Sequence, residues 1–298
     1  MTATIIDGAA IAAGIREALT RQVEDMIARG LLPHLAVILV GQNPASASYV
    51  TGKQRAGQET GIKVVIHKIE ADPDPQQTER RVRDRIDLLN ADPNVHGIIV
   101  QLPLPDGVDP DALLDRIDPL KDVDGLHPIN QGRILQGRER YLPATPHGVQ
   151  QLLVRSGADP GGKRVVIVGR SRLVGMPLAA MLSQKRQGAN ATVTLCHTNT
   201  TDLPAITREA DILVAATGRP QTITSEMVRR GATVIDVGVN RVEDVTRKRG
   251  YRLVGDVDFE SVSTVASAIT PVPGGVGPMT VAMLLNNVTR AARISQQR

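Results

Sequence analysis

The chain has 298 residues, which is long for a single hydrophobic core, so we expect two domains. Its formal charge of +4 is small and its acidic and basic residues are interleaved, which suits anionic small molecules better than nucleic acid. It has no Trp, one Phe and three Tyr, too few aromatic side chains for the stacking surfaces that single-stranded nucleic acids need.

Short β-branched runs alternate with longer amphipathic runs along the first half. They predict strands at 35–41, 63–69 and 97–102, with helices at 9–29, 44–60 and 76–90. Such alternation is typical of a mainly parallel sheet covered by helices. A passage rich in Pro, Gly and Asp follows at 118–133.

The same alternation resumes in the second half, after a helix expected near 145–156. Strands are predicted at 163–169, 191–197, 211–217 and 232–238. The predicted fold class is therefore α/β in both halves.

The cellular compartment is predicted from the single cysteine and the absence of apolar segments. Cys196 has no partner for an internal disulfide, which suits a reducing compartment. The first twenty residues show no basic region before an apolar core, and no apolar run approaches the roughly 20 residues of a membrane span. We expect a cytoplasmic protein that binds neither membranes nor nucleic acid.

The stretch "VVIVGRSRLVGMPLAAML" places a strand, a turn and a helix in succession. Gly169 and Gly175 flank the turn, and Pro177 suits the first helical turn, where its missing N–H is harmless. Backbone N–H groups at such a helix start can face a pyrophosphate. The spacing is G-x5-G where the usual dinucleotide motif is G-x-G-x-x-G, so an ordinary strand-to-helix turn remains the alternative to a Rossmann-type site.

The end of the next strand indicates which dinucleotide would bind. A cofactor without a 2′-phosphate is usually met there by a carboxylate, and this sequence has "CHTNT" instead. Arg170 could reach a 2′-phosphate and Thr198 could donate a hydrogen bond to it, so the pattern favours NADP over NAD. Two further strands end in the glycine-containing stretches "ATGRP" (216–220) and "DVGVN" (236–240), where the rest of the dinucleotide would lie.

A possible reaction centre lies in the first half, on the helix predicted at 44–60. Asn43 can cap this helix, and the i, i+3 and i+4 geometry places Ser46, Tyr49 and Lys53 on one face. An amphipathic surface helix is the alternative interpretation. Glycines at 52 and 57 argue against it, because each costs about 1 kcal/mol in a helix interior and suits a close approach. A lysine held in a partly dry site can lose its proton and act as a base.

Tyr-x-x-x-Lys with a nearby Ser also resembles the short-chain dehydrogenases. In that family the glycine-rich turn precedes the Tyr and Lys on the cofactor domain itself, and here the order is reversed. We therefore interpret this likeness as accidental.

Five stretches together resemble another family: "SASYVTGK", "VQLPLP", "KDVDGLHPIN", "VGRSRLVGMP" and "PVPGGVGPMT". In this order they are similar to the bifunctional methylenetetrahydrofolate dehydrogenase/cyclohydrolase (FolD) family. The resemblance implies oxidation of 5,10-methylenetetrahydrofolate with NADP, hydrolysis of the product to 10-formyltetrahydrofolate, and a homodimer. It also implies a folate-binding catalytic domain at 1–144, a Rossmann-type NADP domain at 145–278, and a last helix, 279–294, that returns to the first domain within 279–298.

The resemblance assigns roles residue by residue. Lys53 matches the catalytic lysine, Tyr49 the tyrosine that positions the ring, Gln101 the glutamine that contacts the lysine, and Asp124 the pterin anchor. Asp122 is not that match. The remaining substrate-side residues are Ser46, Leu102, Pro273, Gly274 and Gly275; the cofactor-side residues are Gly169, Arg170, Ser171, Gly175, Thr198, Gly218 and Val239.

Two other classes of function remain open at this point. One is a different two-lobed NADP enzyme, such as a shikimate or amino-acid dehydrogenase, and the other is an NADP-sensing module without turnover. No metal is expected under any of these, since the six histidines include no H-x-x-x-H pair and the lone cysteine offers no zinc site.

Overall fold

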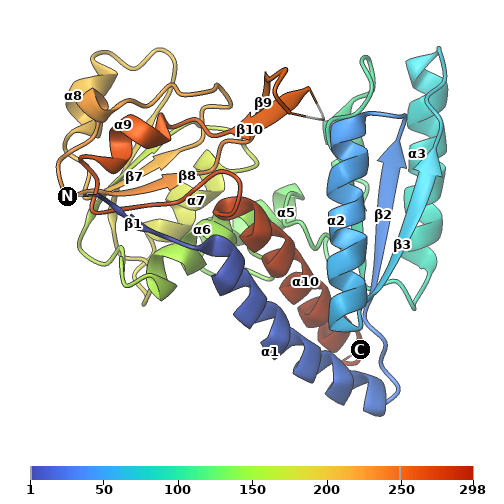
Figure 1. Cartoon of the computed structure of the whole chain (residues 1–298). Helices are drawn as coiled ribbons and strands as arrows, with labels where there is room; N and C mark the ends of the chain where they lie inside the picture. Colours follow the sequence, from blue (N-terminus) through green and yellow to red (C-terminus); the bar gives the residue numbers. More distant parts are fainter. Residues whose placement is uncertain (1, 248–249, 298) are drawn as a thin grey trace. The chain divides into compact units, whose positions relative to one another are not determined.

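The computed structural model describes residues 2–247 and 250–297, which group into two compact units (Figure 1). The six-stranded unit comprises the chain up to Ala13 together with Thr145–Thr280. The three-stranded unit comprises Gly14–Ala144 and the chain from Val281 onward. The expected first domain, 1–144, includes the first thirteen residues, whereas here the chain up to Ala13 groups with the six-stranded unit. The reason is that Thr4 and Ile5 pair with a strand of the six-stranded sheet.

In the three-stranded unit, all strands are parallel and their order is β3-β2-β4. The strands are β2 (His34–Val40), β3 (Lys63–Ile69) and β4 (Gly97–Val100). The helices are α2 (Pro44–Thr60), α3 (Pro75–Ala91), α4 (Pro110–Leu114) and α5 (Pro128–Leu135), and most of α1 (Gly8–Ala28) and of α10 (Val276–Ser295) also belongs here. Helix α10 begins three residues before the expected 279, because Pro278 falls in its first turn, where proline is tolerated.

The two faces of this sheet are covered by different helices. Side chains of α3 and α4 pack against Ala36, Ile38 and Val40 of β2. Helix α2 covers the opposite face, since a Cβ at Gly57 would meet Val64 Cγ2 at 2.3 Å and Val64 pairs with Leu35, on the other side of the pleat. The same arrangement is visible in Figure 1.

The six-stranded unit is a parallel sheet in the order β1-β11-β8-β7-β5-β6. Its strands are β1 (Thr4–Ile5), β5 (Arg164–Val168), β6 (Thr192–Cys196), β7 (Ile212–Ala215), β8 (Thr233–Asp236) and β11 (Ala268–Ile269). Its other elements are α6 (Ala144–Arg155), α7 (Gly175–Leu182), α8 (Leu203–Thr207), η1 (Ser225–Met227), α9 (Phe259–Ser263) and the antiparallel hairpin of β9 (Asn240–Glu243) and β10 (Tyr251–Val254). The order reverses between β5 and β7, the point where doubly wound sheets bind their ligands.

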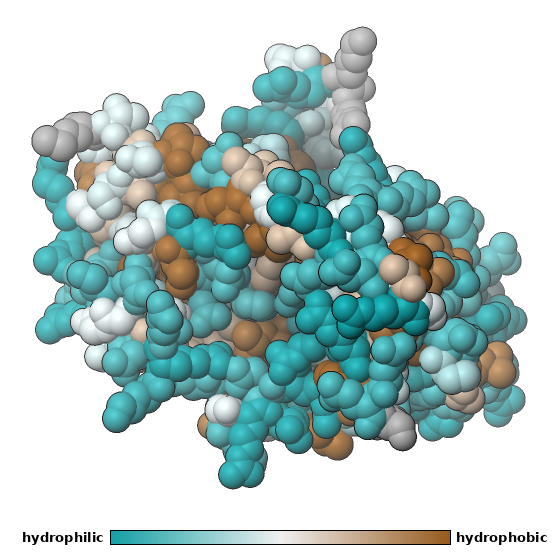
Figure 2. Space-filling model, turned by 90° about the horizontal axis from the view of Figure 1, so that it is seen from below, coloured by the Kyte–Doolittle hydropathy of each residue, from teal (hydrophilic) through white to brown (hydrophobic). Residues whose placement is uncertain are grey.

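Polar side chains dominate the face shown in Figure 2, with hydrophobic ones in small groups between them. None of the helices in the described ranges is long and apolar enough to span a membrane.

Candidate active site

Lys53 is buried on α2, with only 8 % of its surface exposed, and its amino group is held by a side-chain acceptor. Lys53 Nζ donates a hydrogen bond to Gln101 Oε1 at 2.9 Å. Gln101 follows β4 directly, and its backbone N–H donates to Ile38 O at 2.9 Å, which continues the sheet pairing. Its own amide donates from Nε2 to Leu102 O at 2.7 Å, which fixes the orientation of the Oε1 that accepts from Lys53.

Burial shifts the pKa values of Lys53 and Asp124 in opposite directions. Desolvation lowers the pKa of Lys53, while the charge of Asp124 opposes that shift. Desolvation raises the pKa of Asp124, with Lys53 lowering it and Asp122 raising it further. Both shifts favour neutral groups, so the site favours an unprotonated lysine amine more than water does.

Ser46 and Tyr49 lie on the same helix but differ in exposure. Ser46 is buried, and its Oγ has no hydrogen-bond partner among the described residues. Tyr49 is 46 % exposed, so its ring lies at the edge of the buried stripe that includes Ser46 and Lys53. The N–H of Ser46 donates to Asn43 Oδ1 at 3.2 Å, as expected for a capping asparagine. Tyr49 therefore presents an accessible aromatic ring one turn before Lys53, and Ser46 a buried hydroxyl two turns before it.

The two helix glycines differ in what approaches them. At Gly57 the neighbour is β3, through Val64, so that position is required by packing within the unit. At Gly52, apart from its chain neighbours and the backbone of its own helix, a Cβ would find no atom of the described chain within 4 Å.

The loop "KDVDG" is organised by Asp122 and not by Asp124. The Asp122 carboxylate accepts from the N–H groups of Leu126 (3.1 Å) and His127 (2.9 Å) and from Asn130 Nδ2 (2.8 Å). The turn is completed by Gly125 at φ +72°. In the described part of the chain no group donates a hydrogen bond to the Asp124 carboxylate, so that carboxylate remains available to a ligand.

Helix α10 holds this loop from a distant part of the chain. Asn287 Nδ2 donates to Val123 O and to Leu142 O, both at 2.8 Å. Val123 also packs against Gly97: a Cβ at Gly97 would lie 2.7 Å from Val123 Cγ2. Sequence reasoning missed Asn287, because a lone asparagine within an apolar helix carries no motif.

The glycine-rich turn after β5 lies at the point where the strand order reverses. A Cβ on Gly169, whose φ is +126°, would lie 2.0 Å from Ala216 O, in the loop after β7. A Cβ on Gly175 would lie 1.8 Å from Gly169 O. Both positions therefore accept only glycine, and the loops after β5 and β7 meet in close backbone contact.

The side chains around this edge of the sheet are accessible. Arg170, Ser171, Thr198, Gly218 and Val239 are all exposed at the carboxyl ends of their strands. Ser171 closes the turn: its Oγ accepts from Val174 N at 3.1 Å and its carbonyl accepts from Met176 N at 3.1 Å. Those two N–H groups are thus satisfied within the turn.

Pro273, Gly274 and Gly275 form the loop between β11 and α10, in the six-stranded unit. Ala9 N donates to Gly274 O at 2.8 Å, and a Cβ at Gly8 would lie 2.0 Å from Gly275 O. The start of α1 therefore requires glycine and fixes this loop.

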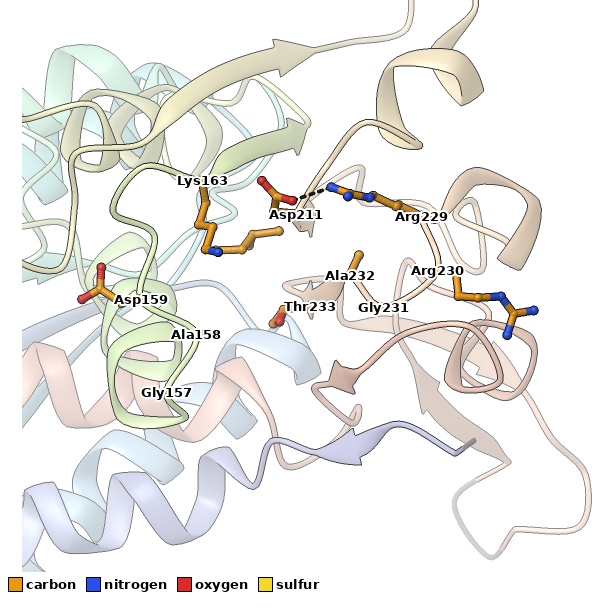
Figure 3. A pocket seen from close by; sticks show the side chains of 11 residues that line it. Gly157, Ala158, Asp159, Lys163, Asp211, Arg229, Arg230, Gly231, Ala232 and Thr233 are labelled. Atoms are coloured by element: carbon orange, nitrogen blue, oxygen red, sulfur yellow. Dashed lines mark hydrogen bonds and ion pairs between the residues drawn. The ribbon is translucent and has the colours of Figure 1, made fainter.

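A hollow of about 320 Å³ lies at the opposite edge of the six-stranded sheet, and it contains none of the predicted cofactor residues (Figure 3). Ile212 and Thr233, which line it, are the first residues of β7 and β8. Arg229 is paired with Asp211 at 2.5 Å, and Arg230 points away from both Asp211 and Lys163 (Figure 3). The basic side chains that line this hollow therefore do not converge on one point.

No cluster of three His, Cys, Asp or Glu side chains suited to a metal ion occurs within residues 2–247 and 250–297.

Comparison with known families gives two matches that together cover most of the chain. Residues 6–124 match the catalytic domain of tetrahydrofolate dehydrogenase/cyclohydrolase, and residues 143–296 match the NAD(P)-binding domain of the same enzymes. The chain belongs to this family. The "Bifunctional protein FolD" of Syntrophus aciditrophicus is 53 % identical over 295 residues, covering 99 % of both chains.

Solved structures of the family show the same fold along the full chain. The bifunctional FolD enzyme of Campylobacter jejuni is 46 % identical with a TM-score of 0.90, covering 98 % of this chain and 99 % of that one. The Trypanosoma brucei FolD, complexed with NADP cofactor and inhibitor, is 38 % identical with a TM-score of 0.93, covering 100 % of both. Membership of the dehydrogenase/cyclohydrolase family excludes the shikimate and amino-acid dehydrogenases left open by the sequence patterns.

Proposed function

We propose that this protein oxidises 5,10-methylenetetrahydrofolate to the 5,10-methenyl form with NADP and hydrolyses that product to 10-formyltetrahydrofolate. The observation that carries the proposal is the buried Lys53 amine, held at 2.9 Å by Gln101 in the catalytic domain of this family. Its burial supports a neutral amine, which is the form that hydrolysis requires.

Lys53 acts as the general base of the cyclohydrolase step. Water attacks the cationic methenyl carbon and must lose a proton, which the neutral amine accepts while Gln101 keeps its nitrogen in place. Tyr49, exposed one turn earlier, stacks on the folate ring, and Ser46 offers its unpaired hydroxyl. Leu102 and, separately, Pro273, Gly274 and Gly275 are further residues that we assign to folate binding.

Asp124 anchors the pterin ring. The pyrimidine edge of a reduced pterin presents an N–H and an amino group side by side, and one carboxylate can accept from both. The free Asp124 carboxylate supports this role, because the hydrogen bonds of the turn itself fall to Asp122.

Residues at the carboxyl edge of the six-stranded sheet would hold the dinucleotide. When bound, NADP supplies the hydride acceptor for the dehydrogenase step. Gly169 and Gly175 allow close approach of the turn, Ser171 shapes it, and Gly218 and Val239 contact the nicotinamide side. Arg170 and Thr198 would recognise the 2′-phosphate. Strand β6 ends without the carboxylate that an NAD enzyme would use there.

For the assembly and the cellular setting, the likeness to this family supports the following proposal. The protein works as a cytoplasmic homodimer, with the folate domain at 1–144 joined by the helix at 279–298 and the NADP domain at 145–278. Its 10-formyl product serves purine biosynthesis.

Two assays test the function. Formation of methenyltetrahydrofolate is followed by absorbance with NADP and then with NAD, and hydrolysis of methenyltetrahydrofolate is followed without a dinucleotide. We expect both activities and a preference for NADP. NADP binding without either turnover would instead support a sensing module.

A further inference from the structure

Two buried carboxylates, Asp236 and Asp256, lie next to the proposed dinucleotide site and have no role in the function above. Asp236 ends β8 and Asp256 follows β10, and their exposed fractions are 3 % and 0 %. Ionised carboxylates are costly to bury unless hydrogen bonds satisfy them, so their partners show what they hold.

Asp236 fixes the position of Asp256. Its carboxylate accepts from the backbone N–H of Gly238 (2.9 Å), Asp256 (2.9 Å) and Val257 (3.0 Å). The carbonyl of Asp256 in turn accepts from Ile223 N at 2.9 Å. The backbone of Asp256 is therefore held from both sides.

The Asp256 carboxylate joins the segments that follow two different strands. Oδ2 accepts from Thr217 N at 2.5 Å and from Gly218 N at 2.9 Å, after β7. Oδ1 accepts from Asn240 Nδ2 at 2.8 Å, after β8. The residue between Gly238 and Asn240 is Val239, so one side chain restrains both segments assigned to the nicotinamide side.

Two glycines make room for these carboxylates. A Cβ at Gly238 would lie 2.2 Å from Asp256 Oδ1, and a Cβ at Gly255 would lie 1.7 Å from Asp236 Oδ2. The stretches "DVG" (236–238) and "GD" (255–256) therefore pack together as one hydrogen-bonded cluster.

We infer that Asp256 is a positioning residue for the dinucleotide, acting through the backbone of Thr217–Gly218 and through Asn240. The inference rests on the proposed function. By holding both segments in place before binding, Asp256 lowers the ordering that binding requires, so its loss weakens dinucleotide affinity.

The test compares Asp256→Ala, Asp256→Asn and the control Asp258→Ala. Alanine removes the acceptor for all three donors, whereas asparagine keeps one acceptor oxygen without the charge. Asp258 lies two residues on and caps α9 by accepting from Ser261 N at 3.4 Å, so its loss affects stability without touching the two segments. NADP dissociation constants, melting temperatures and dinucleotide-free cyclohydrolase rates are measured for each.

The dissociation constant for NADP should rise about tenfold in Asp256→Ala and about threefold in Asp256→Asn, with cyclohydrolase rates unchanged. Asp258→Ala should lower the melting temperature and leave NADP affinity as in wild type. If Asp256→Ala does not fold, the NADP dissociation constant of Asp256→Asn tests the inference instead. Wild-type affinity in the Asp256 variants, or an equal loss in Asp258→Ala, overturns the inference. A wild-type protein that binds no NADP overturns the proposed function instead.

Discussion

Replacing Lys53 by methionine tests the chemistry most directly. Methionine keeps a long, unbranched side chain in the buried position on α2 but has no amine to accept a proton. Within residues 2–247 and 250–297, Lys53 Nζ donates one hydrogen bond, to Gln101, and Gln101 is partly exposed, so water can replace the lost donor. The variant should therefore fold with a melting temperature close to that of the wild type.

The size of the effect follows from the role of a general base. Such assistance contributes about 10²- to 10⁴-fold, so cyclohydrolase activity should fall by that factor. The affinity for NADP should stay within about twofold, since Lys53 and the glycine-rich turn belong to different domains of the family.

The pH profile provides a second signature. Only the neutral amine can act as a base, so the wild-type hydrolysis rate should rise as pH increases through the pKa of Lys53. Burial lowers that pKa, so the rise should be centred below 10.5, the ordinary value for lysine. The methionine variant should lack this rise.

Hydrolysis is measured by the loss of methenyltetrahydrofolate absorbance over a range of pH. Lys68→Met, at an exposed lysine on β3, is the matched control and should behave as wild type. Hydrolysis by Lys53→Met within about threefold of wild type would refute the assignment of Lys53 as the base.

Three further substitutions test the remaining roles. Asp124→Asn should weaken both folate activities together by about 1 to 3 kcal/mol at unchanged melting temperature, because an amide places a donor against a pterin donor; an unstable variant with a near-normal KM for folate would rule the anchor out. Arg170→Ala should raise the KM for NADP more than that for NAD, and equal rises would assign Arg170 to the shared pyrophosphate. Asn287→Ala leaves the carbonyls of Val123 and Leu142 without their donor, so it should raise the KM for folate and lower the melting temperature; a changed melting temperature with an unchanged KM would limit Asn287 to stability.

The sequence by itself determined the α/β class, most of the longer elements and the family. These depend on local patterns: β-branched runs for β2, β5 and β7, capping at Asn43, and glycines at fixed distances in the turn after β5. The two-residue strands β1 and β11 and the hairpin of β9 and β10 were missed, since segments so short show no periodicity and exist only through their pairing partners.

Only the tertiary structure decided which of the aspartates in "KDVDG" is free and which is not. Both carboxylates precede a glycine-containing turn, and local chemistry allows either to cap it. The hydrogen bonds from Leu126, His127 and Asn130 select Asp122, and none of the described residues donates a hydrogen bond to the Asp124 carboxylate. The contributions of Asn287 and Asp256 likewise depend on residues far apart in the chain, because a hydrogen bond between distant segments leaves no spacing in the sequence from which it could be predicted.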